Sequence, residues 1–241
     1  MKEIVKVKVE GQNQVLRKYG LRQNGFVNDK VDAIKCDSLV MARRKLMRIE
    51  GMCSTHYFNE IFQLLPFKPE NRKRFKAFDG INNVFNLAYE VLSWKVYRAL
   101  THAKLEPYLG FLHSLKFGVP SLVCDFQELY RYLIDDFIIQ YCRKLRKKDF
   151  ILKTEYASNN RKGKREHLND SLTKDFVEKL NKYFLTIIEI PRIMRGEKQE
   201  IETLINEEAL LFAKFLRNER QTWKPRILKL SVMEQEKLAR A

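Results

Sequence analysis

His113 and the two acidic residues that follow it are the side chains of this sequence best suited, by type and spacing, to bind a metal ion. Gly118 and Pro120 mark a chain break that can fold His113 back toward Asp125 and Glu128. Because residues three apart on a helix share a face, the two carboxylates can point at the same cation. A histidine with carboxylates suits Mn²⁺ or Mg²⁺ with positions left open for phosphate oxygens. The spacing therefore predicts a divalent-metal site for phosphodiester chemistry.

The charge balance indicates a polyanionic partner. The 241 residues contain 46 Lys and Arg against 30 Asp and Glu, a net charge of +16, which favours a nucleic acid as the partner through counterion release. No apolar run approaches the roughly 18 to 20 residues of a membrane-spanning helix, and the N-terminus has no signal-peptide pattern. The four cysteines form no CxxC pair, which argues against a zinc knuckle. We expect a cytoplasmic protein without a membrane partner.

Four clusters of basic residues are candidates for DNA contacts. Any one cluster is as readily a solvated surface, but the first lies within two helical turns of Glu50, to which the resemblance described below assigns a metal-binding role, so a phosphate-binding track toward the metal is expected. Such contacts position DNA without reading its sequence. The residues predicted to bind DNA are Arg43, Arg44, Arg48, Arg72, Lys73, Arg74, Arg143, Lys144, Arg146, Arg161 and Lys162.

A short β element is predicted at the N-terminus. Apolar and basic residues alternate over 5–9 and then meet Gly11, a pattern typical of a half-exposed strand. A second strand is expected over 14–19, before Gly20. Residues 1–28 are therefore predicted to form a hairpin that serves as a docking or dimerisation element, since a hairpin alone is unstable.

The rest of the chain, 29–241, is predicted to be one helical catalytic domain, so the fold class is mainly α. Apolar residues from Leu39 to Cys53 recur at spacings of three and four, with Asp37 or Ser38 as a cap. A loop or short hairpin is expected between the basic clusters at 143–148 and 161–165. Further helices are predicted at about 82–103, 121–146, 172–195 and 197–218.

Three motifs at compatible separations add a resemblance. They are Arg48-Ile49-Glu50-Gly51 with Tyr57-Phe58, Leu105 to His113, and Ser121 to Arg131 with Asp135. Together they closely resemble the CRISPR-associated protein one family, which implies a metal-dependent endonuclease and integrase of spacer acquisition. The resemblance assigns the metal ligands to Glu50, His113 and Glu128 and makes Asp125 the accompanying acidic residue. In this family the 3′-hydroxyl of a captured DNA fragment, the prespacer, attacks a CRISPR repeat by transesterification.

The resemblance also implies a homo-oligomer, a dimer or tetramer, with a small dimeric CRISPR-associated partner. The residues before Glu50 are too few for the family's usual N-terminal β-domain, so a minimal integrase that acts as its own assembly is an alternative. Two other functions remain open. One is a non-catalytic DNA-binding scaffold, and the other is a metal-dependent nuclease that cuts branched DNA with water as the nucleophile.

Overall fold

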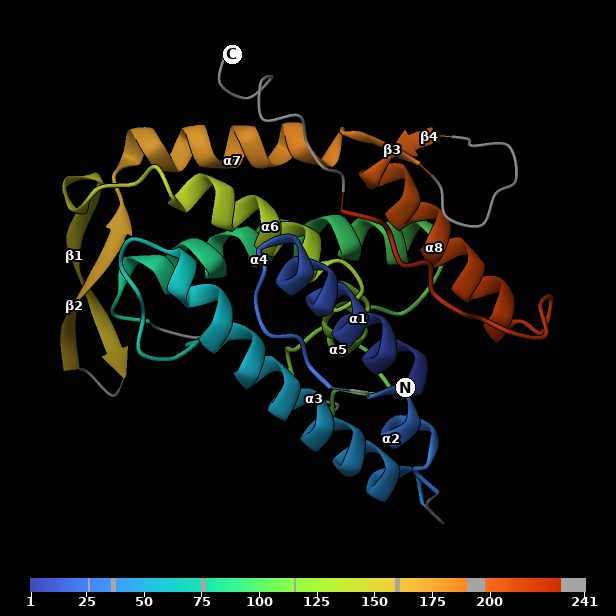
Figure 1. Ribbon diagram of the computed structural model, residues 1–241. Helices are drawn as coiled ribbons and strands as arrows, with labels where there is room; N and C mark the ends of the chain where they lie inside the picture. Colours follow the sequence, from blue (N-terminus) through green and yellow to red (C-terminus); the bar gives the residue numbers. More distant parts are fainter. Residues whose placement is uncertain are drawn as a thin grey trace.

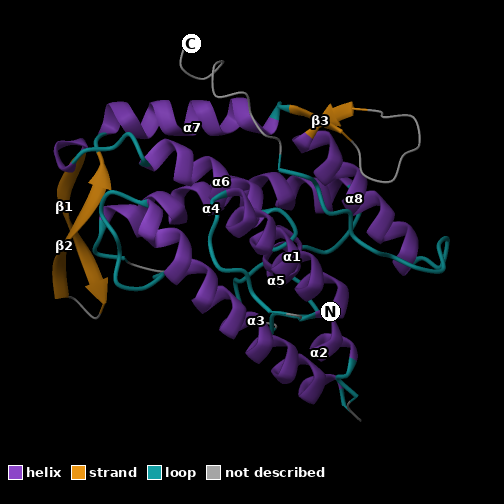
Figure 2. Cartoon of the chain, viewed as in Figure 1, coloured by secondary structure: helices purple, strands orange, loops and turns teal. Residues whose placement is uncertain are grey.

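Helices dominate the fold (Figures 1 and 2). The structure is a computed structural model and describes residues 1–25, 27–35, 38–74, 77–114, 116–158, 161–189 and 198–230, without the side chains of 156–158, 161 and 162. The helices are α1 (Lys2–Lys18), α2 (Asn28–Asp32), α3 (Leu39–Ile61), η1 (Phe62–Leu64), α4 (Gly80–His102), α5 (Ser121–Gln127), α6 (Arg131–Cys142), η2 (Lys147–Asp149), α7 (Asp170–Phe184) and α8 (Ile201–Leu216). The predicted mainly α class is confirmed.

Helices α4 and α6 lie in the middle of the molecule and organise the core. The α4 helix packs against α5, α6 and α8, while α1 packs against α3 and α6 (Figure 1). Asp79 caps α4 by accepting a hydrogen bond from the backbone of Asn82 at 2.8 Å. The buried face of α4 includes Phe85, Ala88 and Leu92, which are spaced to lie on one side of a helix. This packing fixes the polar side chains that α4 and α6 contribute to the site.

Two small antiparallel pairs make up the strands of the described residues. The first joins β1 (Phe150–Ser158) to β2 (Arg161–Leu168), which confirms a hairpin after the basic cluster at 143–148. The backbone N–H of Gly80 donates to Glu166 at 3.2 Å, so this hairpin is attached to the start of α4. The second pair joins β3 (Ile187–Glu189) to β4 (Lys198–Glu200). Neither pair lies at the N-terminus.

The predicted N-terminal β-hairpin of residues 1–28 is wrong, because 2–18 form the helix α1. Alternation over 5–9 suggested a strand with lysines in solvent, yet Lys8 is only 5% exposed. The buried face follows helical spacing from Ile4 through Lys8 to Val15 and Leu16. Lysine on that face obscured the helical period in the sequence, since a buried face is normally apolar.

Gly11 has a packing role in α1. A Cβ atom there would lie 2.3 Å from the ring of Tyr132, a distance that real contacts essentially never show. The missing side chain therefore lets α1 approach α6 closely. The Tyr132 hydroxyl donates to the carbonyl of Leu228 at 2.6 Å. The glycine that the sequence suggested as a strand terminator instead permits a helix–helix contact.

The predicted helix over 121–146 divides into α5 and α6. Leu129 and Tyr130 donate backbone hydrogen bonds to residues three back, at 3.2 and 3.0 Å, in a tight 3₁₀-like turn. This turn places Glu128 at the end of α5 and Arg131 at the start of α6. The helix predicted over 172–195 ends at Phe184, and its residues from 190 onward lie outside the described part. Across the described residues, no helix is long and apolar enough to cross a membrane.

Candidate metal centre and DNA interface

Glu50 points into the protein interior from α3. The helix buries Leu46, Glu50, Cys53 and Tyr57 on one face, at spacings of three and four. The hydroxyl of Ser54, one turn on, donates to the Glu50 carboxylate at 2.9 Å. Glu50 is 6% exposed, which is rare for a glutamate without charged partners. Its position on the core face therefore requires a cation nearby.

Glu128 lies at the end of α5 and is more deeply buried than Glu50, at 2% exposed. Arg131 donates to its Oε1 at 2.7 Å, and the Lys8 ammonium lies 2.6 Å from its Oε2. Burial alone would raise the pKa of Glu128, but the attraction of Arg131, Lys8 and Arg74 outweighs burial and holds the pKa at about 2. The carboxylate is therefore charged at neutral pH.

Lys8 joins the two carboxylates. Its ammonium contacts Oε1 of Glu50 as well as Oε2 of Glu128, so three elements, α1, α3 and the end of α5, meet at one point. Burial acts to raise the pKa of Glu50, but Lys8 opposes it and the net pKa is lowered. Sequence reasoning missed Lys8 because 2–18 were interpreted as β. A helical interpretation would have placed a lysine among buried positions, a signal for an acidic partner.

Asp125 holds the loop that carries His113. Its Oδ2 accepts backbone N–H bonds from Phe111 and Leu112 at 2.7 and 2.9 Å, and Oδ1 accepts from the His113 backbone at 2.8 Å. The Nδ1 atom of His113 lies 2.6 Å from the same Oδ1. Because a carboxylate can only accept, the neutral His113 ring carries its hydrogen on Nδ1, which leaves a lone pair on Nε2. Asp125 is thus committed to positioning His113.

The carboxylate pair fits a divalent cation in charge and donor chemistry. Glu50 and Glu128 already enclose a cation, the Lys8 ammonium, and oxygen donors are the ligands that Mg²⁺ and Mn²⁺ prefer. Within the described ranges, no three His, Cys, Asp or Glu side chains stand close enough to hold a metal. The structure joins Glu50 to Glu128 through Lys8, and it joins His113 to Asp125.

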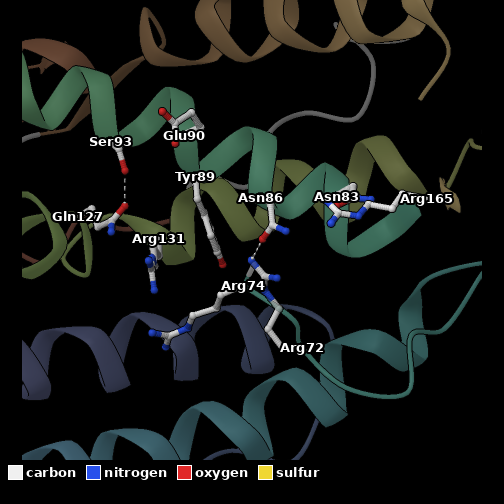
Figure 3. Close-up of a pocket in the computed structure, with 10 residues that line it drawn as sticks. All are labelled: Arg72, Arg74, Asn83, Asn86, Tyr89, Glu90, Ser93, Gln127, Arg131 and Arg165. Carbon is white, nitrogen blue, oxygen red and sulfur yellow. Dashed lines mark hydrogen bonds between the residues drawn. The ribbon is translucent and has the colours of Figure 1, made fainter. Parts of the chain in front are cut away.

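A polar cavity of about 440 Å³ is lined by ten residues, which Figure 3 shows as sticks. Arg131, which holds Glu128, and Arg74, whose guanidinium is 3.9 Å from Glu50, both line it. Figure 3 shows the side chains of α4 along one wall, with Ser93 hydrogen-bonded to Gln127 at 2.9 Å. The other lining residues are Arg72, Asn83, Asn86, Tyr89, Glu90 and Arg165. Arginine and amide donors suit a phosphate-bearing ligand.

The basic residues predicted to bind DNA occupy different environments. Arg74 is half-exposed and lies 3.9 Å from Glu50. Arg72 instead donates to Asn86 at 2.8 Å, and its guanidinium packs against the rings of Phe58, Phe85 and Tyr89. These contacts give Arg72 a structural role. Arg43 donates to the carbonyl of Phe111 at 3.0 Å and so supports the histidine loop. Arg44, Arg48 and Lys73 are exposed.

The remaining predicted DNA contacts lie elsewhere. Arg143, Lys144 and Arg146 are exposed beyond the far end of α6, a helix about 18 Å long at 1.5 Å per residue. The Arg143 guanidinium lies 4.7 Å from the Tyr19 ring centroid. Arg161 and Lys162 begin β2, and their side chains lie outside the described part of the chain. Among the predicted DNA-binding side chains that the structure describes, Arg74 approaches a carboxylate of the centre, 3.9 Å from Glu50.

A further buried acid adjoins the centre. Asp135 of α6 accepts hydrogen bonds from the hydroxyls of Tyr57, at 2.9 Å, and Tyr89. Burial is the larger effect and raises the pKa of Asp135 to about 6, against the two hydroxyls and Arg131, which lower it. The Arg131 guanidinium lies 4.6 Å from the Tyr89 ring centroid, so this cluster supports the residue that holds Glu128.

Comparison with known proteins gives a consistent result. A family model described as CRISPR associated protein Cas1 matches residues 1–182. CRISPR-associated endonuclease Cas1 3 of Thermus thermophilus is 36% identical over 92 residues, which cover 37% of this chain and 28% of that protein. CRISPR-associated endonuclease Cas1 1 of Thermodesulfovibrio yellowstonii is 28% identical over 155 residues, which cover 63% and 46%. The chain spans less than half of the length of these two relatives.

Solved structures share the fold. A CAS1 protein from Thermotoga maritima aligns with a TM-score of 0.74 and 22% identity, covering 92% of this chain and 66% of that one. A casposase bound to its integration product aligns with a TM-score of 0.74 and 20% identity, covering 92% and 60%. A partial Cas6-RT-Cas1–Cas2 complex gives a TM-score of 0.76 and 18% identity, covering 95% and 68%. At these identities the likeness establishes the fold.

Proposed function

This chain belongs to the Cas1 family of CRISPR-associated proteins, and on that premise we propose that it is a metal-dependent DNA endonuclease and integrase of CRISPR adaptation. Its substrates are a short double-stranded DNA fragment with free 3′-hydroxyl ends and a CRISPR repeat. The reaction is a transesterification in which the 3′-hydroxyl displaces one oxygen of a repeat phosphodiester. The observation that carries the proposal is the convergence of two buried carboxylates, Glu50 and Glu128, on one cation.

Glu50, Glu128 and Nε2 of His113 are the proposed ligands of Mg²⁺ or Mn²⁺. When bound, the metal would polarise the scissile phosphate or activate the attacking hydroxyl. Asp125 keeps the His113 ring in the orientation and tautomer that leave Nε2 free. Arg131 holds Glu128 in place, while Arg74, at the edge of the cavity, offers N–H donors to a phosphate. Arg44, Arg48 and Lys73 extend the positive surface for the DNA backbone.

The proposed assembly is a homo-oligomer on DNA with Cas2 as a partner. The support is the fold shared with a chain whose solved structure is named as a Cas6-RT-Cas1–Cas2 complex. A chain that acts as its own assembly is the alternative, and an assay with and without Cas2 separates the two.

A strand-transfer assay tests the proposal directly. Purified protein, Mn²⁺ or Mg²⁺, a labelled duplex with free 3′-hydroxyls and a supercoiled plasmid carrying a CRISPR repeat are combined, with His113→Ala beside the wild type. We expect label joined to the plasmid by the wild type and none by the variant. Joining by His113→Ala contradicts the proposed site. Plasmid cutting without joining, with Cas2 present, favours a simple nuclease that uses water.

One observation favours a second candidate, a non-catalytic DNA-binding scaffold. Lys8 already pairs with both Glu50 and Glu128, which is the arrangement expected of a carboxylate pair kept for stability. The scaffold predicts that the protein binds DNA but neither joins nor cuts it under any metal, and that His113→Ala binds DNA like the wild type.

A further inference from the structure

Three cationic side chains face two carboxylates in the candidate centre. Lys8 contacts both Glu50 and Glu128, Arg131 donates to Glu128 at 2.7 Å, and Arg74 lies 3.9 Å from Glu50. These five groups carry three positive and two negative charges, so the centre has one positive charge in excess before any metal arrives. A divalent cation added to this set would meet net repulsion at close range.

Lys8 stands where such a cation would bind. Its ammonium contacts carboxylate oxygens of both glutamates, so a metal that bridges Glu50 and Glu128 must take its place. The backbone of Lys8 has little freedom to withdraw, because Ile4 and Leu16 of α1 are fully buried and Gly11 packs on Tyr132. Only the side chain can move.

The interior offers the displaced ammonium no room. The cavity that adjoins Lys8, lined also by Gln12, Glu128 and Asp135, has a volume of about 10 Å³, which accommodates at most one water molecule. An ammonium without an anionic partner is costly to bury. The larger cavity is lined by Arg74 and Arg131, which contact Glu50 and Glu128, and an anion bound there gives the ammonium a new partner.

We propose that Lys8 couples metal binding to DNA binding. The Lys8 ammonium holds the carboxylate pair until a DNA phosphate enters beside Arg74 and Arg131. It then moves to the phosphate and leaves Glu50 and Glu128 to the divalent cation. This inference rests on the proposed metal site. Because coupling free energies are reciprocal, the metal must strengthen DNA binding by the same factor by which DNA strengthens metal binding.

Mn²⁺ binding measured by electron paramagnetic resonance tests the coupling. The full chain is titrated with Mn²⁺, with and without a short duplex bearing free 3′-hydroxyls, and a Glu128→Gln titration subtracts binding elsewhere. We expect the duplex to raise the Mn²⁺ affinity of the wild type by about tenfold or more. Lys8→Gln should bind Mn²⁺ about tenfold more tightly without DNA and show a DNA effect smaller by the same factor.

Two variants control for the loss of a buried ion pair. Lys18 lies on the same helix and pairs with the buried Asp136 at 2.8 Å, so Lys18→Gln removes a similar contact outside the centre and should leave both Mn²⁺ affinities unchanged. Lys8→Arg keeps the cation and should retain the DNA effect of the wild type. Circular dichroism establishes that each variant is folded before its titration is interpreted.

The outcomes separate this inference from the proposed function. Equal Mn²⁺ affinity of the wild type with and without DNA overturns the coupling, whatever the variants do. The role of Lys8 is overturned, while the metal site stands, if folded Lys8→Gln binds Mn²⁺ without DNA no more tightly than the wild type. It is also overturned if Lys8→Arg binds Mn²⁺ like Lys8→Gln. No Mn²⁺ binding sensitive to Glu128→Gln, even with DNA, overturns the proposed metal site itself.

Discussion

Glu128 and Asp135 are both almost fully buried acids in one part of the core, but their pKa values are shifted in opposite directions. Glu128 has cationic partners, Arg131 and Lys8, and its pKa is held at about 2. Asp135 accepts hydrogen bonds from the hydroxyls of Tyr57 and Tyr89, and burial raises its pKa to about 6. The difference lies in the partners, since burial acts on both acids in the same direction.

The comparison indicates which acid is available for chemistry. A carboxylate paired with cations can exchange one cation for another, so under the proposed coupling Glu128 would accept a metal when Lys8 withdraws. A carboxylate held by phenol hydroxyls has no cation to exchange, and Asp135 therefore serves to fix Tyr57 and Tyr89. The Tyr89 ring in turn supports Arg131, whose guanidinium lies 4.6 Å from the ring centroid. Asp135, through Tyr89, thus helps to position Arg131 and, through Arg131, Glu128.

The largest expected effect follows from neutralising Glu128. Glu128→Gln removes a proposed ligand and leaves Lys8 and Arg131 without their shared charge, so strand transfer should fall below detection. Unfolding free energy should drop by about 3 to 5 kcal/mol, the usual result of breaking a buried ion pair. Strand-transfer assays and urea denaturation measure the two effects. Joining within a few-fold of the wild type would show that Glu128 is no ligand.

The Asp135 cluster makes the second prediction, in the pH dependence of stability. Its folded pKa, about 6, lies above the ordinary value of 3.8. The protonated acid is therefore favoured by folding, and its stabilising contribution is full below pH 3.8 and lost as pH rises through 6. Two pKa units correspond to about 3 kcal/mol.

Asp135→Asn isolates this contribution because it mimics the protonated acid. We expect the unfolding free energy of the wild type, minus that of the variant, to decline between pH 4 and pH 6.5 and then level off. Urea denaturation across this range measures the difference, in which the other titrating groups cancel. A difference that rises with pH would mean that folding stabilises the ionised form of Asp135, as a cationic partner does for Glu128, and the two acids would then not differ in this respect.

The third prediction concerns the anchor of His113. Asp125→Asn loses the charge that fixes Nδ1 and keeps only one oxygen for the three backbone N–H donors. Mn²⁺ affinity in the presence of DNA should fall by about 10- to 100-fold, as for other residues that orient a metal-binding histidine. A folded Asp125→Asn that binds Mn²⁺ like the wild type would mean that His113 needs no anchor.

The sequence predicted helices well where the buried face was apolar. Ser38 caps α3 as expected, accepting from the backbone of Met41 at 3.2 Å, and the helix predicted over 82–103 is α4, Gly80–His102. It failed over 2–18, where Lys8 and Gln12 occupy the buried face and mask the helical period. Local pattern cannot show that a lysine is buried when its acidic partners lie 42 and 120 residues away in the chain.

The site was predicted in part for the same reason. The resemblance named Glu50, His113, Asp125 and Glu128, and the structure brings them together as two pairs. The resemblance did not indicate Lys8, and it included Arg131 only as the last residue of a motif. Both residues act through long-range contacts, and the break at Leu129 that separates Glu128 from Arg131 interrupts a sequence with uniform helical character. Charge partners across a core are set by packing, which motif spacing does not encode.

The smallest expected effect sharpens the comparison within the Asp135 cluster. Tyr57→Phe removes one hydroxyl that lowers the pKa of Asp135, so stability should fall by about 1 kcal/mol, and the pH midpoint of the Asp135 contribution should move upward. Tyr141→Phe is the matched control, because it removes a hydroxyl bonded to Asp175 at 3.0 Å and should leave that midpoint in place. Urea denaturation of both variants between pH 4 and pH 8 provides the measurement. A downward shift of the midpoint in Tyr57→Phe would show that hydroxyl donation does not stabilise the ionised form of Asp135. The difference in pKa between Asp135 and Glu128 would then have to arise from something other than their hydrogen-bond and ion-pair partners.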